Sequence, residues 1–360
     1  MRLLTLYIPI LKGLRWEFSA LAHLYPATEH RILPLFHLIH DQSRSVVPTF
    51  LKHLDHQPLE PGSALDIAVE CHAPLTHQLR DLVHTPLFHI SQRCLAGDMP
   101  RVIPVLRPDS PAPTVAAARH AAAQHRRGIC VRVALHQMEA NPHHTVDHVR
   151  DLLERAGQRP HNVRLIIDVG AVSGETTLTT HTTLVVKAVQ ALSETDWQLL
   201  AVSSGAFPHP VELAELPRRQ PHPYLRYDAS LWRRVTSELP DSRLDFSDYG
   251  VVHPHRPPAA PSSAPDPFLA YTVGEQWQVR IYDRRLPGND DFMTLCSELT
   301  QSPDWPTAGA RTSWGDEELL SCARRTRGSG RAGGPSQWLA WATSHHMETV
   351  VQRLNRIGRP

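Results

Sequence analysis

Short apolar runs alternate with stretches of helical periodicity along most of the chain. The apolar runs have the length of buried strands and lie at residues 4–11, 31–39, 64–70, 102–106, 129–135, 163–169, 197–202 and 244–252. The third is ambiguous, because residues 86–90 form a rival run nearby. The stretches with helical periodicity lie between the runs, at residues 17–24, 46–54, 115–124, 146–156 and 183–192.

This alternation indicates the fold class. Strands that are apolar at nearly every position and alternate with amphipathic helices are typical of a parallel sheet that is covered by helices. The number of such units within residues 2–252 matches a closed barrel of eight strands and eight helices. We therefore expect a (β/α)8, TIM-barrel-like α/β fold. An open doubly wound sheet is the alternative, but no glycine-rich fingerprint follows any of the strands, which favours the barrel.

The pattern changes after residue 252. Residues 253–267 are rich in proline and predict a connector that forms no core. Residues 268–282 predict a β-hairpin with its turn near Gly274 and Glu275. Helical patterns follow at residues 291–299 and 336–354, separated by a loop rich in glycine and arginine at residues 324–334. We expect residues 268–360 to form a hairpin-and-helix appendage that packs on the barrel.

The composition of the chain limits the partners and the compartment that we expect for the protein. The net charge is only +1, so no overall field draws the protein to nucleic acid or to a membrane surface. The five cysteines are scattered and never form a Cys-x-x-Cys pair, which argues against a disulfide framework and a thiolate zinc site. No apolar stretch approaches the roughly 18 residues of a membrane span, and Pro9 and Lys12 interrupt the first apolar run, unlike a signal peptide. We expect a cytoplasmic protein.

Polar side chains follow several of the predicted strands. In a (β/α)8 barrel, functional residues gather at the carboxyl ends of the strands and in the loops that follow. The mixture of cations, carboxylates and hydroxyls there predicts a site for a phosphate or carboxylate group, with Asp168 or Asp248 as a catalytic base or metal ligand. The side chains are Lys12, Arg15, His37, His40, Arg107, Asp168, Ser203, Ser204, Asp248 and Tyr249.

Each of these positions also has a structural interpretation. Asp168 can accept hydrogen bonds from the following loop, Ser203 and Ser204 can belong to an ordinary turn, and Asp248 with Tyr249 can pack the closing seam of the barrel. His345 and His346 are adjacent on a predicted helix, so they point about 100° apart and do not form a zinc pair, although one can face the barrel and the other solvent. No complete Walker or G-x-S-x-G motif is present.

The order of several segments resembles one family. YIPILKGLRWEFSAL followed by RILPLFHLI is similar to the opening of the phage and bacterial "beta protein" family. LIIDVG, VSSGAFP, DFSDYGVVHP, YTVGEQWQVR, GDEELLSCA and the final histidine-containing segment extend the resemblance over nearly the whole chain. The residues that this resemblance places on positions matching the family are Tyr7, Lys12, Glu17, Asp168, Ser204, Asp248, Tyr249, His345 and His346. His37 departs from the pattern, because the family carries a glutamate there. The resemblance implies a barrel and a phage or phage-defence context, but no reaction.

Two functional hypotheses follow. The first is a barrel that binds or processes a phosphorylated or anionic small ligand such as a nucleotide. The second is a non-catalytic protein-interaction component of a defence or phage–host complex. Nucleic-acid binding ranks below both. The sequence identifies no cofactor and does not decide whether the protein is an enzyme. The predicted ligand-binding residues are Lys12, Arg15, Glu17, Arg107, Ser203, Ser204, Tyr249, His345 and His346.

Overall fold

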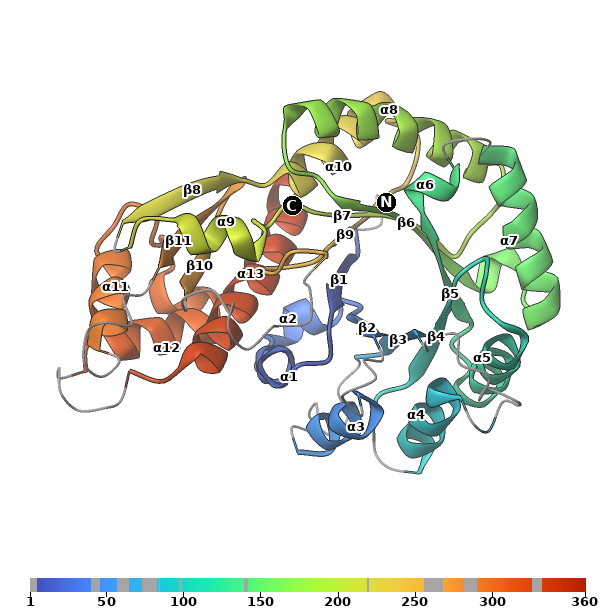
Figure 1. Cartoon of the computed structure of the whole chain (residues 1–360), viewed down its shortest axis with the longest axis horizontal. Helices are drawn as coiled ribbons and strands as arrows, with labels where there is room; N and C mark the ends of the chain where they lie inside the picture. The colour runs from blue at the N-terminus through green and yellow to red at the C-terminus, as the bar shows by residue number, and fades with distance from the viewer. Residues whose placement is uncertain are drawn as a thin grey trace.

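A closed barrel of eight parallel strands forms the larger part of the molecule (Figure 1). The computed structural model describes residues 5–39, 46–56, 65–72, 83, 85–96, 99–138, 142–218, 220–255, 268–281, 290–325 and 332–360. The barrel strands are β1 (Tyr7–Leu11), β2 (Leu35–Ile39), β3 (Ile67–His72), β4 (Val102–Leu106), β5 (Ile129–Ala134), β6 (Val163–Ala171), β7 (Leu199–Gly205) and β9 (Asp245–Asp248). Strand β9 pairs with both β7 and β1, which closes the barrel. The predicted (β/α)8 class is confirmed.

Helices cover the outside of this barrel. They are α1 (Arg15–Leu21), α2 (Pro26–Glu29), α3 (Val46–His56), α4 (Pro86–Leu95), α5 (Ala112–His125), α6 (Leu135–Met138), α7 (Pro142–Ala156), α8 (Glu175–Leu192) and α10 (Tyr227–Glu238). Helix α9 (Pro210–Glu215) lies instead over the smaller unit described below, where Leu213 packs with Trp277 and Val279 (Figure 1). The rival third strand at residues 86–90 is therefore helical. Thr85 caps helix α4 by accepting a hydrogen bond from the Phe88 N–H at 3.2 Å, and Pro86 occupies the first turn. Both features favour a helix start.

Two apolar layers lie on opposite sides of the barrel strands. The outer layer combines strand residues such as Val131 and Leu165 with helix residues such as Ile90 and Val149. The inner layer consists almost entirely of strand residues, among them Ile8, Ile10, Leu35, Ala68, Ile103, Val105, Cys130, Ile166 and Ala201. Successive side chains of a strand point to opposite faces, so each strand supplies both layers. This double burial explains why the strands read as continuous apolar runs.

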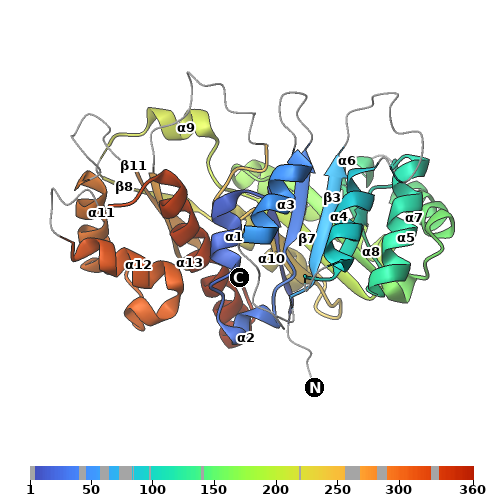
Figure 2. The same ribbon diagram turned by 90° about the horizontal axis from the view of Figure 1, so that it is seen from below.

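A smaller unit lies beside the barrel, on the side of α1 (Figures 1 and 2). Its antiparallel sheet has the order β10 (Phe268–Val273), β11 (Gln276–Ile281) and β8 (Pro221–Leu225). The predicted hairpin is present, and its two-residue turn is Gly274–Glu275. Strand β8 was not predicted, because Pro221 and Pro223 interrupt any strand signal; its place at the sheet edge tolerates them.

Three helices complete this unit, namely α11 (Asp290–Thr300), α12 (Trp314–Ala323) and α13 (Pro335–Ile357). Helix α13 packs against α1 and β10 and also contacts β1. His40, residues 256–267 of the predicted connector and residues 326–331 of the predicted basic loop lie outside the described residues. Within the described part of the chain, none of the helices is long and apolar enough to cross a membrane.

Candidate functional site

A group of polar side chains points inward at the carboxyl ends of the barrel strands. Strand alternation places them on the same face as the inner apolar layer, because all but one lie two positions beyond a residue of that layer and Tyr249 itself belongs to it. Each of the eight strands, or the residue just after it, contributes one member. We call this set the mouth ring. It consists of Lys12, His37, Glu70, Arg107, Arg132, Asp168, Ser203 and Tyr249.

Arg132 connects the mouth ring. Its guanidinium, only 3% exposed, pairs with Glu70, with Asp168 at 2.7 Å and with the Tyr249 hydroxyl at 2.6 Å. The Tyr249 hydroxyl in turn donates to Asp168 at 2.8 Å. Glu70 also accepts a hydrogen bond from Arg107. Burial alone would raise the pKa of Glu70, but the neighbouring Arg132 and Arg107 outweigh it and hold that pKa well below its ordinary value. Glu70 is therefore ionised.

Lys12 enters the ring directly after β1. Its ammonium lies 5.4 Å from the centroid of the Tyr249 ring and donates to the Pro254 carbonyl at 3.3 Å. It forms no ion pair with a described carboxylate. Burial, and then the positive charge of Arg132, lower the pKa of Lys12 to about 8. Lys12 is therefore easier to deprotonate than an ordinary lysine.

Two buried polar atoms of the ring have no hydrogen-bond partner among the described residues. They are the hydroxyl of Ser203, which is fully buried, and Nε of Arg132. Most buried polar atoms in proteins are paired, so such exceptions mark positions where a ligand can supply the partner. Burial lowers the pKa of His37 to about 3, which keeps that side chain neutral. The ring thus carries three cations against two carboxylates, a net charge of +1.

Glu17 is a positioning residue of this region. Its carboxylate, 2% exposed, accepts hydrogen bonds from the backbone N–H of Lys12 at 3.0 Å and of Leu14 at 2.7 Å. It therefore fixes the turn between β1 and α1 that presents Lys12. Burial raises the pKa of Glu17 to about 7, despite these hydrogen bonds. Arg15 begins α1 and is exposed, outside the mouth ring.

Asp248 lies on the opposite face of its strand from Tyr249. Its fully buried carboxylate accepts hydrogen bonds from the Tyr7 hydroxyl at 2.7 Å and the Gly250 N–H at 2.9 Å, and lies 2.9 Å from Nε2 of His346. Arg226 is 3.4 Å away. These contacts join the outer face of the β1–β9 seam to helix α13. We call this set the seam cluster, and it consists of Tyr7, Arg226, Asp228, Asp248, Thr272 and His346.

The remaining predicted residues also lie away from the mouth. Ser204 pairs in register with Asp248 and shares its outward face. Ser203 and Ser204 belong to strand β7, so the expectation of an ordinary turn there is wrong. His345 and His346 are both buried, so neither faces solvent. His345 contacts Asp316 at 2.9 Å and the Thr272 carbonyl at 2.9 Å.

The structure thus brings together six of the residues predicted for the barrel rim, and sequence reasoning missed two others. Those that meet in the mouth ring are Lys12, His37, Arg107, Asp168, Ser203 and Tyr249. The missed members are Glu70 and Arg132. Each is a single charged residue in an apolar run: Glu70 ends the run AVE, and Arg132 lies within CVRVA. A buried charge needs a partner, so this pattern was a usable signal.

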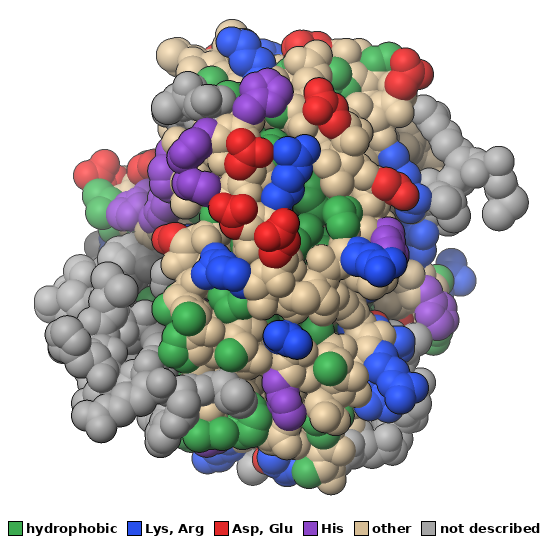
Figure 3. Space-filling view, turned by 90° about the vertical axis from the view of Figure 1, so that its right-hand side faces the viewer, with side chains coloured by type: hydrophobic (Ala, Val, Ile, Leu, Met, Phe, Trp, Pro, Cys, Tyr) green, Lys and Arg blue, Asp and Glu red, His purple; other side chains and the backbone are tan. Residues whose placement is uncertain are grey.

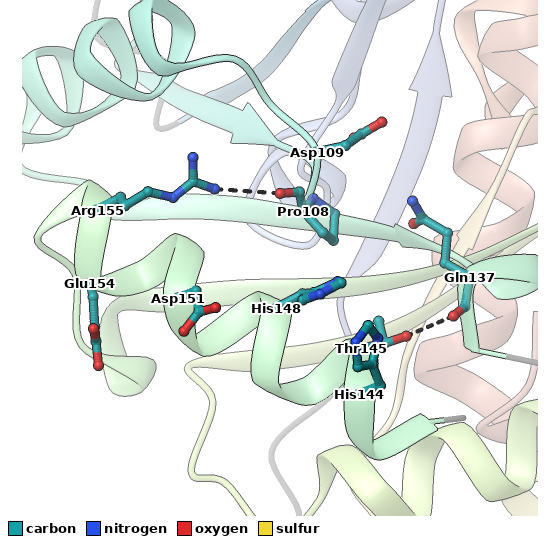
Figure 4. Close-up of a pocket in the computed structure, with 9 residues that line it drawn as sticks. All are labelled: Pro108, Asp109, Gln137, His144, Thr145, His148, Asp151, Glu154 and Arg155. Carbon is teal, nitrogen blue, oxygen red and sulfur yellow. Dashed lines mark hydrogen bonds between the residues drawn. The ribbon is translucent and has the colours of Figure 1, made fainter. Parts of the chain in front are cut away.

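A groove on the outer surface is a second candidate (Figures 3 and 4). It has a volume of about 820 Å³ and lies between the β4–α5 loop, α6 and α7. Figure 4 shows Arg155 donating to the Pro108 carbonyl and Thr145 donating to the Gln137 carbonyl. Three carboxylates line the groove beside that one guanidinium, and Figure 3 shows histidine and acidic side chains gathered on this face. An anion is therefore better accommodated in the mouth ring.

The described residues contain no group of three or more histidine, cysteine or acidic side chains that could hold a metal ion. A comparison with curated proteins finds no match. A family model described as Beta protein matches residues 7–352, which include every strand of the barrel and most of helix α13. The chain therefore belongs to the Beta protein family.

Proposed function

We propose that the barrel mouth binds a small anionic ligand that carries a phosphate or carboxylate group, such as a nucleotide. The observation that carries this proposal is the mouth ring itself, whose net charge is +1 and whose Ser203 hydroxyl and Arg132 Nε lack partners among the described residues. An anion would satisfy both donors and balance the charge. The phage or phage-defence context implied by the family resemblance is part of the same proposal.

The members of the ring would have different roles. Arg107 is 26% exposed and Lys12 is half-buried, so both can reach a ligand at the mouth. Arg132 and Glu70 are almost fully buried and hold the other side chains in place, so Nε is the atom of Arg132 that remains for the ligand. The Tyr249–Asp168 pair, 2.8 Å apart, supplies a hydroxyl and a carboxylate for proton transfer. We assign no ligand contact to Asp248, Ser204, His345 or His346, because they face the seam or the smaller unit.

Calorimetric titration with inorganic phosphate and with AMP tests the proposal. The unaltered protein should bind at least one probe, and Arg107→Met should weaken binding about tenfold to a hundredfold, since a hydrogen bond to a charged group contributes about 1.5–3 kcal/mol. Arg155→Met, in the outer groove, is the matched control and should leave the affinity unchanged. Absence of binding for both probes, or equal affinity for Arg107→Met, would overturn the proposal. Either result would favour the second hypothesis, an interaction component without a ligand.

A further inference from the structure

The choice of lysine at position 12 is unusual for this chain. Lysine and arginine together number 37, but only Lys12, Lys52 and Lys187 are lysines. Arginine binds phosphate and carboxylate through two parallel hydrogen bonds and is the better residue for anion recognition alone. A chain that otherwise relies on arginine has a primary amine at the barrel mouth. A primary amine differs from a guanidinium in one respect that matters here: it can lose its proton and act as a nucleophile.

The surroundings of Lys12 make its ammonium easier to deprotonate than that of an ordinary lysine. Its described contacts are the Pro254 carbonyl and the face of the Tyr249 ring, and no described carboxylate pairs with it. Burial and the charge of Arg132 oppose the ammonium, whereas the charges of Glu17, Asp168 and Glu70 favour it. The balance still leaves the pKa of Lys12 below its ordinary value. Desolvation beside another cation is a known way to activate a lysine nucleophile. Lys52 and Lys187 differ from it, because both are exposed on the helices α3 and α8.

We infer that Lys12 forms a reversible imine with a small aldehyde or ketone that also carries an anionic group. This inference rests on the proposed anion site, because Arg107 and the partnerless donors of Ser203 and Arg132 would hold the anionic end. The deprotonated nitrogen attacks the carbonyl carbon, and the C=O electron pair moves to oxygen. Loss of that oxygen as water leaves the iminium. Overall, the ammonium and the carbonyl compound give an iminium and water. The two hydrogens that nitrogen loses leave in the water, so no oxidant is needed.

The mouth ring contains groups that can transfer the protons of this reaction. The carbinolamine oxygen must gain a proton before it leaves as water, and nitrogen must lose one before it attacks. The Tyr249 hydroxyl donates to Asp168, and the Tyr249 ring lies against the Lys12 ammonium. Asp168 lies close enough for its charge to act on Lys12, so we assign to it the role of taking a proton in one step and returning it in the other. Tyr249 and Asp168 remain unchanged over the cycle.

Reductive trapping tests the inference. The protein is incubated with pyridoxal 5′-phosphate as the probe, reduced with cyanoborohydride, and analysed by intact mass and peptide mapping. With a pKa of about 8 for Lys12, its neutral fraction at pH 7.5 is on the order of 200 times that of an ordinary lysine. We expect one lysine adduct, on Lys12, at least tenfold faster than on Lys52 or Lys187. Its rate at low probe concentration should rise between pH 7 and 9.

Two variants separate this inference from the anion site. The Lys52→Arg, Lys187→Arg protein retains Lys12 alone and should give the same single adduct. Lys12→Arg should lose the adduct while it still binds inorganic phosphate, because the charge remains. Phosphate binding without any adduct on Lys12 would overturn the imine and leave the anion site standing. Equal labelling of all three lysines would also overturn it, as ordinary lysine reactivity. Failure of both phosphate binding and labelling would remove both proposals.

Discussion

Arg132 is the side chain that connects the other members of the mouth ring. It is almost fully buried and contacts Glu70 of β3, Asp168 of β6 and Tyr249, which directly follows β9. Arg132→Met should therefore leave two carboxylates without their main partner. Removing one member of a buried ion pair costs about 3–5 kcal/mol, so the urea midpoint should fall sharply.

The matched variant is Arg107→Met, because Arg107 shares Glu70 with Arg132 but is 26% exposed. Glu70 keeps Arg132 in that variant, so the loss should be about 1 kcal/mol, typical of an accessible pair. Circular dichroism during urea unfolding measures both. Equal losses for the two variants would show that Arg132 does not have the central position described here.

Glu17 makes the free energy of unfolding depend on pH. Burial raises its pKa from the usual 4.5 to about 7, so between these values the unfolded chain has released a proton that the folded chain keeps. The fold is then stabilised fully below pH 4.5 and loses that contribution as pH rises through 7, by about 3 kcal/mol in all. Glu17→Gln has no proton to release and should show a flatter profile. Urea unfolding from pH 5 to 8 compares the two, and parallel profiles would contradict the assignment.

At the scale of elements, the apolar pattern of the sequence identifies the barrel strands but does not show which side chains of each strand face the barrel interior. A strand that is buried on both sides carries no alternation of apolar and polar residues. The apolar pattern therefore predicts both Asp248 and Tyr249 at the mouth, although adjacent residues of an extended segment point to opposite faces. The inward charges of Glu70 and Arg132 mark the orientation of their strands. Strand β8 had no such signal, because its prolines hide an edge strand.

The turn from β1 to α1 is the element on which the position of Lys12 depends. Gly13 has φ +73°, and an added Cβ would lie 2.8 Å from Leu38 Cδ2 and 2.9 Å from Phe50 Cδ2. Gly13→Ala should destabilise the fold by about 1–3 kcal/mol through backbone strain and overpacking. It should also weaken phosphate binding, because the turn displaces Lys12. Calorimetry and urea unfolding of one preparation measure both effects.

Gly334 supplies the control for that substitution. It precedes helix α13 with φ −144°, and an added Cβ would meet nothing within 4 Å. Gly334→Ala should stay within about 1 kcal/mol of the unaltered protein, as expected for an N-cap change from glycine. A Gly13→Ala protein as stable as Gly334→Ala would show that the β1–α1 turn accepts another conformation.

At the scale of the whole molecule, the smaller unit covers the place where the barrel closes. Strand β9 joins β7 to β1, and helix α13 contacts α1 and β1 beside this seam. The seam cluster links the two parts through Asp248 and His346, with Thr272 bonded to the other nitrogen of His346 at 2.8 Å. Both parts should therefore unfold in one step, because neither satisfies these buried groups alone.

His346→Ala tests that coupling. The change removes two buried hydrogen bonds and leaves a cavity at the seam, so we expect a loss of about 2–4 kcal/mol. Five of the eight tryptophans, Trp277, Trp305, Trp314, Trp338 and Trp341, lie in the smaller unit, so fluorescence reports mainly on it, while far-ultraviolet circular dichroism reports on the whole chain. Both signals should move to lower urea by the same amount. His148→Ala on the exposed face of α7 should move neither, and a separate early fluorescence transition in His346→Ala would show that the smaller unit unfolds without the barrel.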